Sequence, residues 1–170
     1  MSEVNLSALT TEALSKSDVL WLRAGGRERL TWFATGEDQL AGQVLLVSGG
    51  PEADLGPLPE QVELVLRSKG DGGRLLTLRA RAQSIAVGNP WWEPAAAALL
   101  SERLNAPGDL VDRWRESATL WLLSPFGTPV QAPGSPGPEG GARVAERTTA
   151  GAAATRMRRP WHLGGRGTRG

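Results

Sequence analysis

Cysteine is absent from this chain of 170 residues, and histidine occurs once, as His162 near the C-terminus. Without cysteine the chain can form neither a disulfide framework nor a thiolate metal site. Its single histidine excludes a Ser-His-Asp or Cys-His constellation from the part of the chain that can fold. The acidic pairs Glu37-Asp38 and Asp109/Asp112 suit turns and helix starts, so no metal site is expected. No catalytic residue can therefore be assigned.

Long apolar runs are also missing. No stretch approaches the roughly 20 apolar residues that a transmembrane helix needs. The first 19 residues, MSEVNLSALTTEALSKSDV, carry acids and have no apolar segment of the kind found in signal peptides. We expect a soluble, cytoplasmic protein without a membrane partner.

The charge is distributed unevenly along the chain. Residues 1–132 carry 12 Lys/Arg against 16 Asp/Glu, a net charge of −4, whereas residues 133–170 carry 7 Arg against 2 Glu, a net charge of +5. Residues 1–132 are predicted to form one domain with an N-terminal helix. Residues 133–170 have few large apolar side chains and are predicted to be a disordered Gly/Pro/Arg-rich tail. The acidic domain argues against nucleic acid as a partner, although the basic tail could neutralise phosphates.

The chain is organised around residues 62–85, VELVLRSKGDGGRLLTLRARAQSI. Apolar residues alternate on both sides of a Gly-rich segment, which predicts a long β-hairpin. A four-residue loop would set Arg67 opposite Leu76. A five-residue loop over residues 69–73 pairs Leu66 with Leu76 and Glu63 with Arg79, and it keeps the apolar faces together. We favour the five-residue loop, with Gly70, Gly72 and Gly73 supplying its positive φ angles.

The remaining elements follow from periodicity and turn residues. Strands are predicted at residues 19–24, 27–34, 43–48 and 117–123, and Pro125, Pro129 and Pro133 are expected to end regular structure. A helix is predicted over residues 91–105, with Asn89 as a possible N-cap and Leu104 among its inward residues, and a second, short helix follows. Together with the hairpin this gives a mainly β fold with helices (α+β), a six-stranded antiparallel split β-barrel.

The segments LTWFATGEDQ and VLLVSGG, with the hairpin VELVLRSKGDGGRLLTLRARAQSI, resemble the flavin-binding split β-barrel family typified by pyridoxamine 5′-phosphate oxidase. The similarity covers roughly residues 17–125. It implies a homodimer with FMN, or a deazaflavin, between the subunits. The residues that would meet the cofactor ring are Thr31, Trp32, Phe33, Val47, Ser48 and Gly49.

Phosphate recognition is assigned from the residues themselves. Guanidinium and ammonium groups suit phosphate oxygens, so Arg67 and Lys69 on the hairpin are the best candidates. Family members usually place a base soon after the third strand, whereas this chain has Glu52, Asp54 and Glu60 there.

Two functions fit the sequence. The first is a flavin-dependent oxidoreductase of unknown substrate, in which the cofactor supplies the redox chemistry. The alternative is a dimeric split barrel without cofactor that acts as a small-ligand-binding or protein-interaction module.

Overall fold

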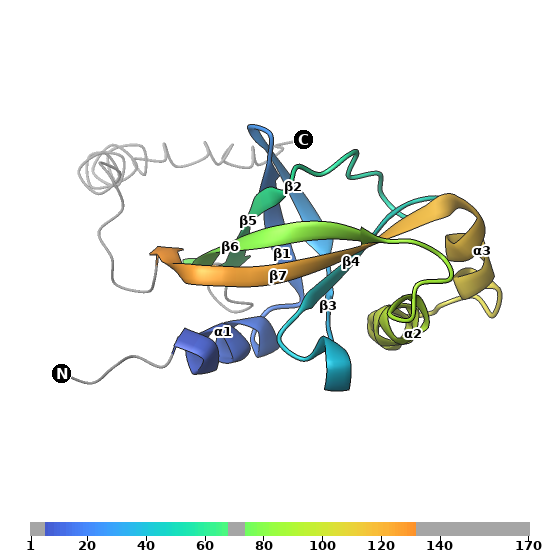
Figure 1. The fold of residues 1–170 in the computed structure, drawn as a ribbon, viewed down its shortest axis with the longest axis horizontal. Helices are drawn as coiled ribbons and strands as arrows, with labels where there is room; N and C mark the ends of the chain where they lie inside the picture. The colour runs from blue at the N-terminus through green and yellow to red at the C-terminus, as the bar shows by residue number, and fades with distance from the viewer. Residues whose placement is uncertain (1–5, 68–73, 132–170) are drawn as a thin grey trace, which may run out of the picture. The chain divides into compact units, whose positions relative to one another are not determined.

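The structure, a computed structural model, describes residues 6–67 and 74–131 of the chain. Seven strands form one antiparallel sheet in the order β2-β1-β5-β6-β7-β4-β3 (Figure 1). The elements in chain order are α1 (Leu6–Ser15), β1 (Val19–Ala24), β2 (Arg27–Trp32), β3 (Ala34–Thr35), the short 3-10 helix η1 (Asp38–Leu40), β4 (Val44–Gly49), β5 (Gln61–Arg67), β6 (Arg74–Ile85), α2 (Trp92–Glu102), α3 (Leu110–Ser117) and β7 (Ala118–Gln131).

A single residue, Phe33, joins the two ends of the sheet. β2 pairs with β1, whereas β3, which begins at Ala34, pairs with β4. The strand predicted over residues 27–34 therefore divides at Phe33, and the sheet has seven strands where six were expected. The Phe33 side chain is buried in the barrel interior. The α+β split-barrel fold is confirmed.

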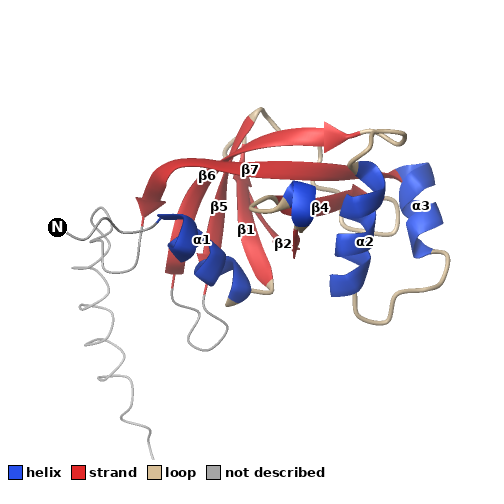
Figure 2. Ribbon diagram, turned by 60° about the horizontal axis from the view of Figure 1, so that its bottom comes forward, coloured by secondary structure: helices blue, strands red, loops and turns tan. Residues whose placement is uncertain are grey.

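The two faces of the sheet bury different cores. One face fills the barrel interior, and the opposite face is covered at one end by α2 and α3, which lie together, while α1 lies apart from them (Figure 2). Side chains alternate between the faces because successive residues of a strand point in opposite directions. The interior includes Leu20, Leu22, Val62, Leu64, Leu66, Leu76, Leu78 and Ala80. The helix-covered core includes Leu45, Val47, Ile85, Trp92, Trp114 and Leu120.

The register of the central hairpin is confirmed. Leu66 pairs with Leu76, and Glu63 pairs with Arg79, as the five-residue loop requires. The pairing then shifts by one residue, so that Arg67 lies opposite Arg74 instead of Leu75. The turn itself, with Gly70, Gly72 and Gly73, lies outside the described residues.

β7 continues well beyond the predicted end at Leu123, so the expectation that Pro125 and Pro129 end regular structure is wrong. Pairing between β7 and β4 stops at Leu123, whereas pairing with β6 continues to Gln131 through a bulge. Within the described part of the chain, β7 beyond Leu123 thus has a strand on one side only. A proline is tolerated at such an edge because the missing N–H does not break a ladder.

The predicted helix over residues 91–105 is shorter than expected. It ends at Glu102, and Arg103 already has extended backbone angles, φ −86° and ψ 104°. Leu104, expected to point inward, is 83% exposed as a result. Asn89 is not the N-cap, a position that Trp91 takes, and its side chain instead accepts a hydrogen bond from Trp91 N at 2.9 Å in the turn before the helix.

Within residues 6–67 and 74–131, no helix is long and apolar enough to cross a membrane. The predicted tail, residues 133–170, lies outside the described part of the chain, so its disorder stays a prediction.

The barrel interior should dominate the free energy of unfolding. Leu64 is fully buried between β1 and β6, so Leu64→Ala is expected to lower that free energy by about 3 kcal/mol through lost burial and a residual cavity. Leu104→Ala is the matched control and should change it by less than about 0.5 kcal/mol. Urea denaturation of both variants measures the difference, and equal effects would contradict this description of the core.

Candidate functional site

The residues expected to meet a flavin ring lie on both faces of the sheet. Phe33 is buried in the barrel interior, and Val47 is buried beneath α2 and α3. The hydroxyl of Thr31 is directed to its own chain, since Oγ1 donates to the carbonyl of Trp32 at 3.1 Å. Within residues 27–33, only Trp32 presents a half-buried ring on the outer face of the barrel.

Ser48 holds the connection between β4 and β5 in place. We call residues 50–60 the strap. Ser48 Oγ accepts a hydrogen bond from Leu55 N at 2.8 Å, and the Leu55 side chain is buried in the barrel interior. On the other side Arg29 Nη1, from β2, donates to the carbonyl of Asp54 at 2.9 Å. The strap therefore bridges β4 and β2, which do not pair with each other, and closes the open side of the barrel.

Gly49 begins the turn that leads into the strap. Its φ of +85° favours glycine, because other residues are strained in this region. Gly49 N donates to the carbonyl of Ala53 at 3.2 Å, and the Gly49 carbonyl accepts from Glu52 N at 3.1 Å. The backbone groups expected to face a cofactor are thus paired with the strap.

The acids of the strap have structural partners. Asp54 Oδ1 accepts a hydrogen bond from Gly56 N at 2.7 Å, a local turn that an aspartate often stabilises. Glu52 Oε1 lies 3.3 Å from Trp114 Nε1 and 3.3 Å from Arg103 Nε. Glu52 and Asp54 therefore organise the protein itself.

Trp32, Glu52, Arg103 and Trp114 form a compact cluster, which we call the Trp–Glu box. The two indole rings are tilted by 34° with centroids 6.4 Å apart, and the Arg103 guanidinium lies 5.8 Å above the Trp32 ring. The sequence pointed to Trp32 alone. Glu52 is 51 residues from Arg103 and 62 from Trp114, so no local motif could reveal the other members.

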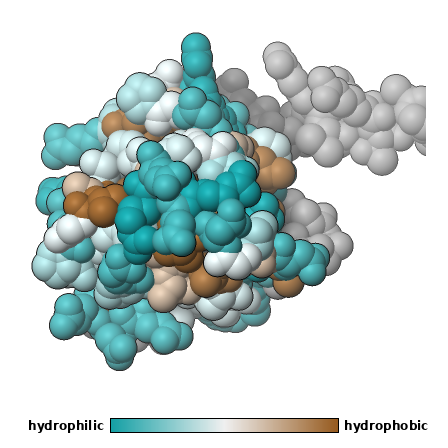
Figure 3. All heavy atoms as spheres, turned by 90° about the vertical axis from the view of Figure 1, so that its right-hand side faces the viewer, coloured by the Kyte–Doolittle hydropathy of each residue, from teal (hydrophilic) through white to brown (hydrophobic). Residues whose placement is uncertain are grey.

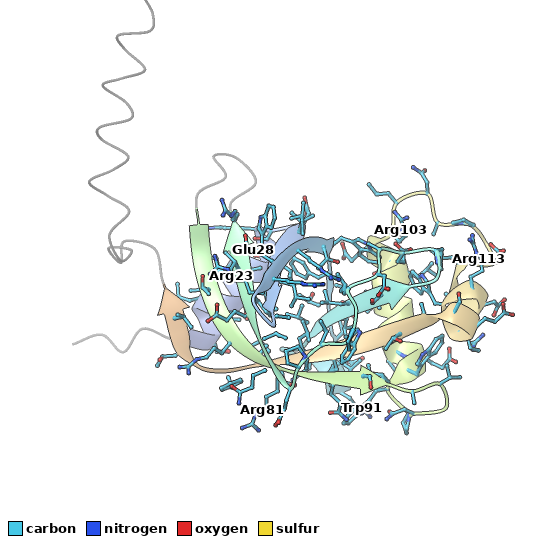
Figure 4. All side chains as sticks on the ribbon, turned by 90° about the horizontal axis from the view of Figure 1, so that it is seen from above. Arg23, Glu28, Arg81, Trp91, Arg103 and Arg113 are labelled. Carbon is cyan, nitrogen blue, oxygen red and sulfur yellow. The ribbon has the colours of Figure 1, made fainter. Side chains whose placement is uncertain are left out.

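A charge ladder crosses the outer face of the barrel. Glu28, Arg23, Glu63 and Arg79 lie opposite one another on β2, β1, β5 and β6, with Phe126 of β7 at the end. Arg23 bonds to Glu28 and its Nη1 lies 3.7 Å from Glu63, and Figure 4 shows Arg23 beside Glu28. The hydrogen bond to Glu28 raises the pKa of the Arg23 guanidinium above its ordinary value. The ladder lines a shallow depression of about 490 Å³.

The arginines of the hairpin separate into two places. The Arg67 guanidinium lies 5.7 Å above the ring of Trp21 in β1, whereas Arg79 and Arg81 lie 5.9 Å and 5.3 Å from the ring of Phe126. Each is therefore held by an aromatic ring of the chain. Lys69, the second predicted phosphate ligand, lies outside the described residues.

Apolar side chains are exposed on the outer face of the β1–β2 hairpin. Val19 is 42% exposed and Leu30 is 51% exposed, and the half-buried rings of Trp21 and Trp32 lie opposite them across the two strands. We call these four residues the β1–β2 face. The Arg23–Glu28 pair of the charge ladder follows them on the same face, so an apolar surface adjoins a charged one.

The predicted residues do not gather at one place within the described part of the chain. At Ser48 and Gly49 the hydroxyl and the backbone groups already have hydrogen-bond partners in the strap. Trp32 and Arg67 do share the outer face and lie on either side of β1. A cofactor could use these two residues together, but without the other half of the expected site.

Comparisons with known proteins find similarity to solved structures alone. No protein-family model and no curated protein matches the chain. HutZ, the heme storage protein from Vibrio cholerae, is 17% identical with a TM-score of 0.49, over 76% of this chain and 98% of that chain. A candidate 5-nitroimidazole antibiotic resistance protein from Bacteroides thetaiotaomicron is 11% identical with a TM-score of 0.48, over 73% of this chain and 82% of that chain. No functional residue is transferred from either.

The hydrogen bond of Ser48 should matter for closure of the barrel. Ser48→Ala leaves the Leu55 N–H without its acceptor and is expected to lower the free energy of unfolding by about 2 kcal/mol. Ser101→Ala removes an exposed hydroxyl that bonds only to its own helix and is the control. Amide hydrogen exchange should accelerate at Leu55 in the first variant alone. Unchanged exchange there would show that Ser48 does not hold the strap.

Proposed function

We propose that the chain is a homodimeric split-barrel module whose two copies meet on the β1–β2 face. The observation that supports this is the exposure of Val19 and Leu30 beside two half-buried tryptophans on one hairpin. Exposed apolar side chains that adjoin one another, rimmed by charges, are typical of interaction surfaces. The end of the domain that α2 and α3 form is mainly hydrophilic in the view of Figure 3 and is the poorer candidate.

The charge ladder beside the β1–β2 face suits contact between identical copies. In a two-fold interface each patch meets itself in the opposite direction. Glu28, Arg23, Glu63 and Arg79 alternate in sign, so two antiparallel ladders can place opposite charges together. Such complementarity adds register and specificity more than affinity. A stable dimer buries about 800 Å² of accessible surface on each copy. The proposed interface therefore includes both the β1–β2 face and the charge ladder.

The oligomeric state tests this proposal. Light scattering after size exclusion should give twice the mass of the chain, and Leu30→Asp should give the monomer, because it buries a charge in the interface. Val87→Asp is the control, since Val87 is 52% exposed but lies between β6 and α2, away from this face. A monomeric wild-type protein, or a Leu30→Asp protein that stays dimeric with its circular dichroism unchanged, would refute the proposal.

Flavin-dependent oxidoreduction at the same face is the second candidate. The specific observation in its favour is the position of Trp32 and Arg67 on either side of β1, an aromatic ring and a guanidinium on one surface. FMN or a deazaflavin would stack on the aromatic side and direct its phosphate to Arg67. Any redox chemistry would come from the cofactor when bound.

A flavin titration tests the second candidate. FMN and a deazaflavin should quench the tryptophan fluorescence saturably, and Arg67→Ala should weaken FMN binding by about 10-fold or more through loss of a charge-assisted hydrogen bond. Arg27→Ala, an exposed arginine at the far end of β2, should leave the affinity unchanged. Absent quenching with both cofactors would eliminate flavin and leave the dimeric module standing.

A further inference from the structure

The Trp–Glu box contains a carboxylate that is almost completely removed from solvent. The Glu52 side chain is 6% exposed, whereas its ionic partner Arg103 is 41% exposed. A buried carboxylate needs a cation or several hydrogen bonds, because burial of an unpaired charge is costly. The cation that meets this need comes from the surface side of the box.

The box is held together without Arg103. Glu52 N bonds to the carbonyl of Gly49, and Glu52 Oε1 also accepts from Nε1 of Trp114, whose ring is fully buried. Trp32 is fixed at the end of β2 and packs against Trp114. Three separate segments, β2, the strap and α3, thus supply an aromatic wall and a carboxylate that stay in place if the guanidinium leaves.

Arg103 itself is weakly held. Its contact with Glu52 is through Nε alone at 3.3 Å, longer than the roughly 2.8 Å of a strong charge-assisted bond and without the two-pronged geometry that arginine can offer. It follows the last residue of α2, next to the exposed Leu104 and to Asn105 with a φ of +54°. The side chain can therefore leave by a local movement of an exposed connection.

We propose that the Trp–Glu box is a binding site for small guanidinium compounds, and that Arg103 is its tethered occupant. Glu52 neutralises the ligand, Trp32 supplies the face on which the planar cation lies, and Trp114 orients the carboxylate. Proteins recognise guanidinium groups with a carboxylate and an aromatic ring that both contact the same cation. The proposal does not depend on the dimer, although the box shares Trp32 with the β1–β2 face.

Methylguanidinium chloride is the probe, titrated into wild type and variants at constant ionic strength adjusted with sodium chloride. Arg103→Ala should bind it saturably, with half-saturation on the order of 10 mM seen as a change in tryptophan fluorescence. The wild-type protein should need an at least about 10-fold higher methylguanidinium concentration for half-saturation, because the tethered Arg103 side chain competes at high effective concentration. Bound ligand should also raise the melting temperature of Arg103→Ala by about 2 °C.

Matched variants separate binding from a merely structural ion pair. Arg113→Ala removes an exposed arginine of α3 outside the box, labelled in Figure 4, and it should behave as wild type. Glu52→Gln in the Arg103→Ala background should abolish the saturable change. A linear response in Arg103→Ala, or one equal to that of Arg113→Ala, would show that Arg103 is only a structural partner of Glu52 and would overturn the proposal.

Discussion

Closure of the barrel is the constraint on which the other features depend. The chain passes from one end of the sheet to the other through Phe33, so β2 and β4 approach without pairing. The strap fills the resulting opening, with Leu55 in the interior and Ser48 as its anchor. Because the strap begins with the turn after Gly49, the same closure also carries Glu52 to the tryptophans.

The strap explains why a surface expected to receive a cofactor is used by the chain itself. The hydroxyl of Ser48 and the N–H of Gly49 bond to strap residues, so these polar groups serve the fold itself. Among the described residues, the β1–β2 face and the Trp–Glu box carry the groups on which the proposals for binding rest.

Local rules predicted the hairpin because its information is local. Alternating apolar residues and the pairing of Glu63 with Arg79 permit one register, and a slip by one residue would expose the whole interior face. The end of β7 could not be predicted in this way. A proline is excluded only from strands that are paired on both sides, and the local sequence does not show that β7 has a single neighbour beyond Leu123. The box could not be predicted either, because Glu52, Arg103 and Trp114 meet only after the helices pack on the sheet.

The last part of β7 has a consequence for how copies of the chain can meet. Beyond Leu123 the strand has a neighbour only in β6 among the described residues, and such edges invite strand addition and aggregation. Pro125 and Pro129 remove two N–H donors there, and the bulge at Gly127, with a φ of +68°, twists the edge further from a flat template. The prolines and the bulge make this edge a poor template for strand addition by another copy.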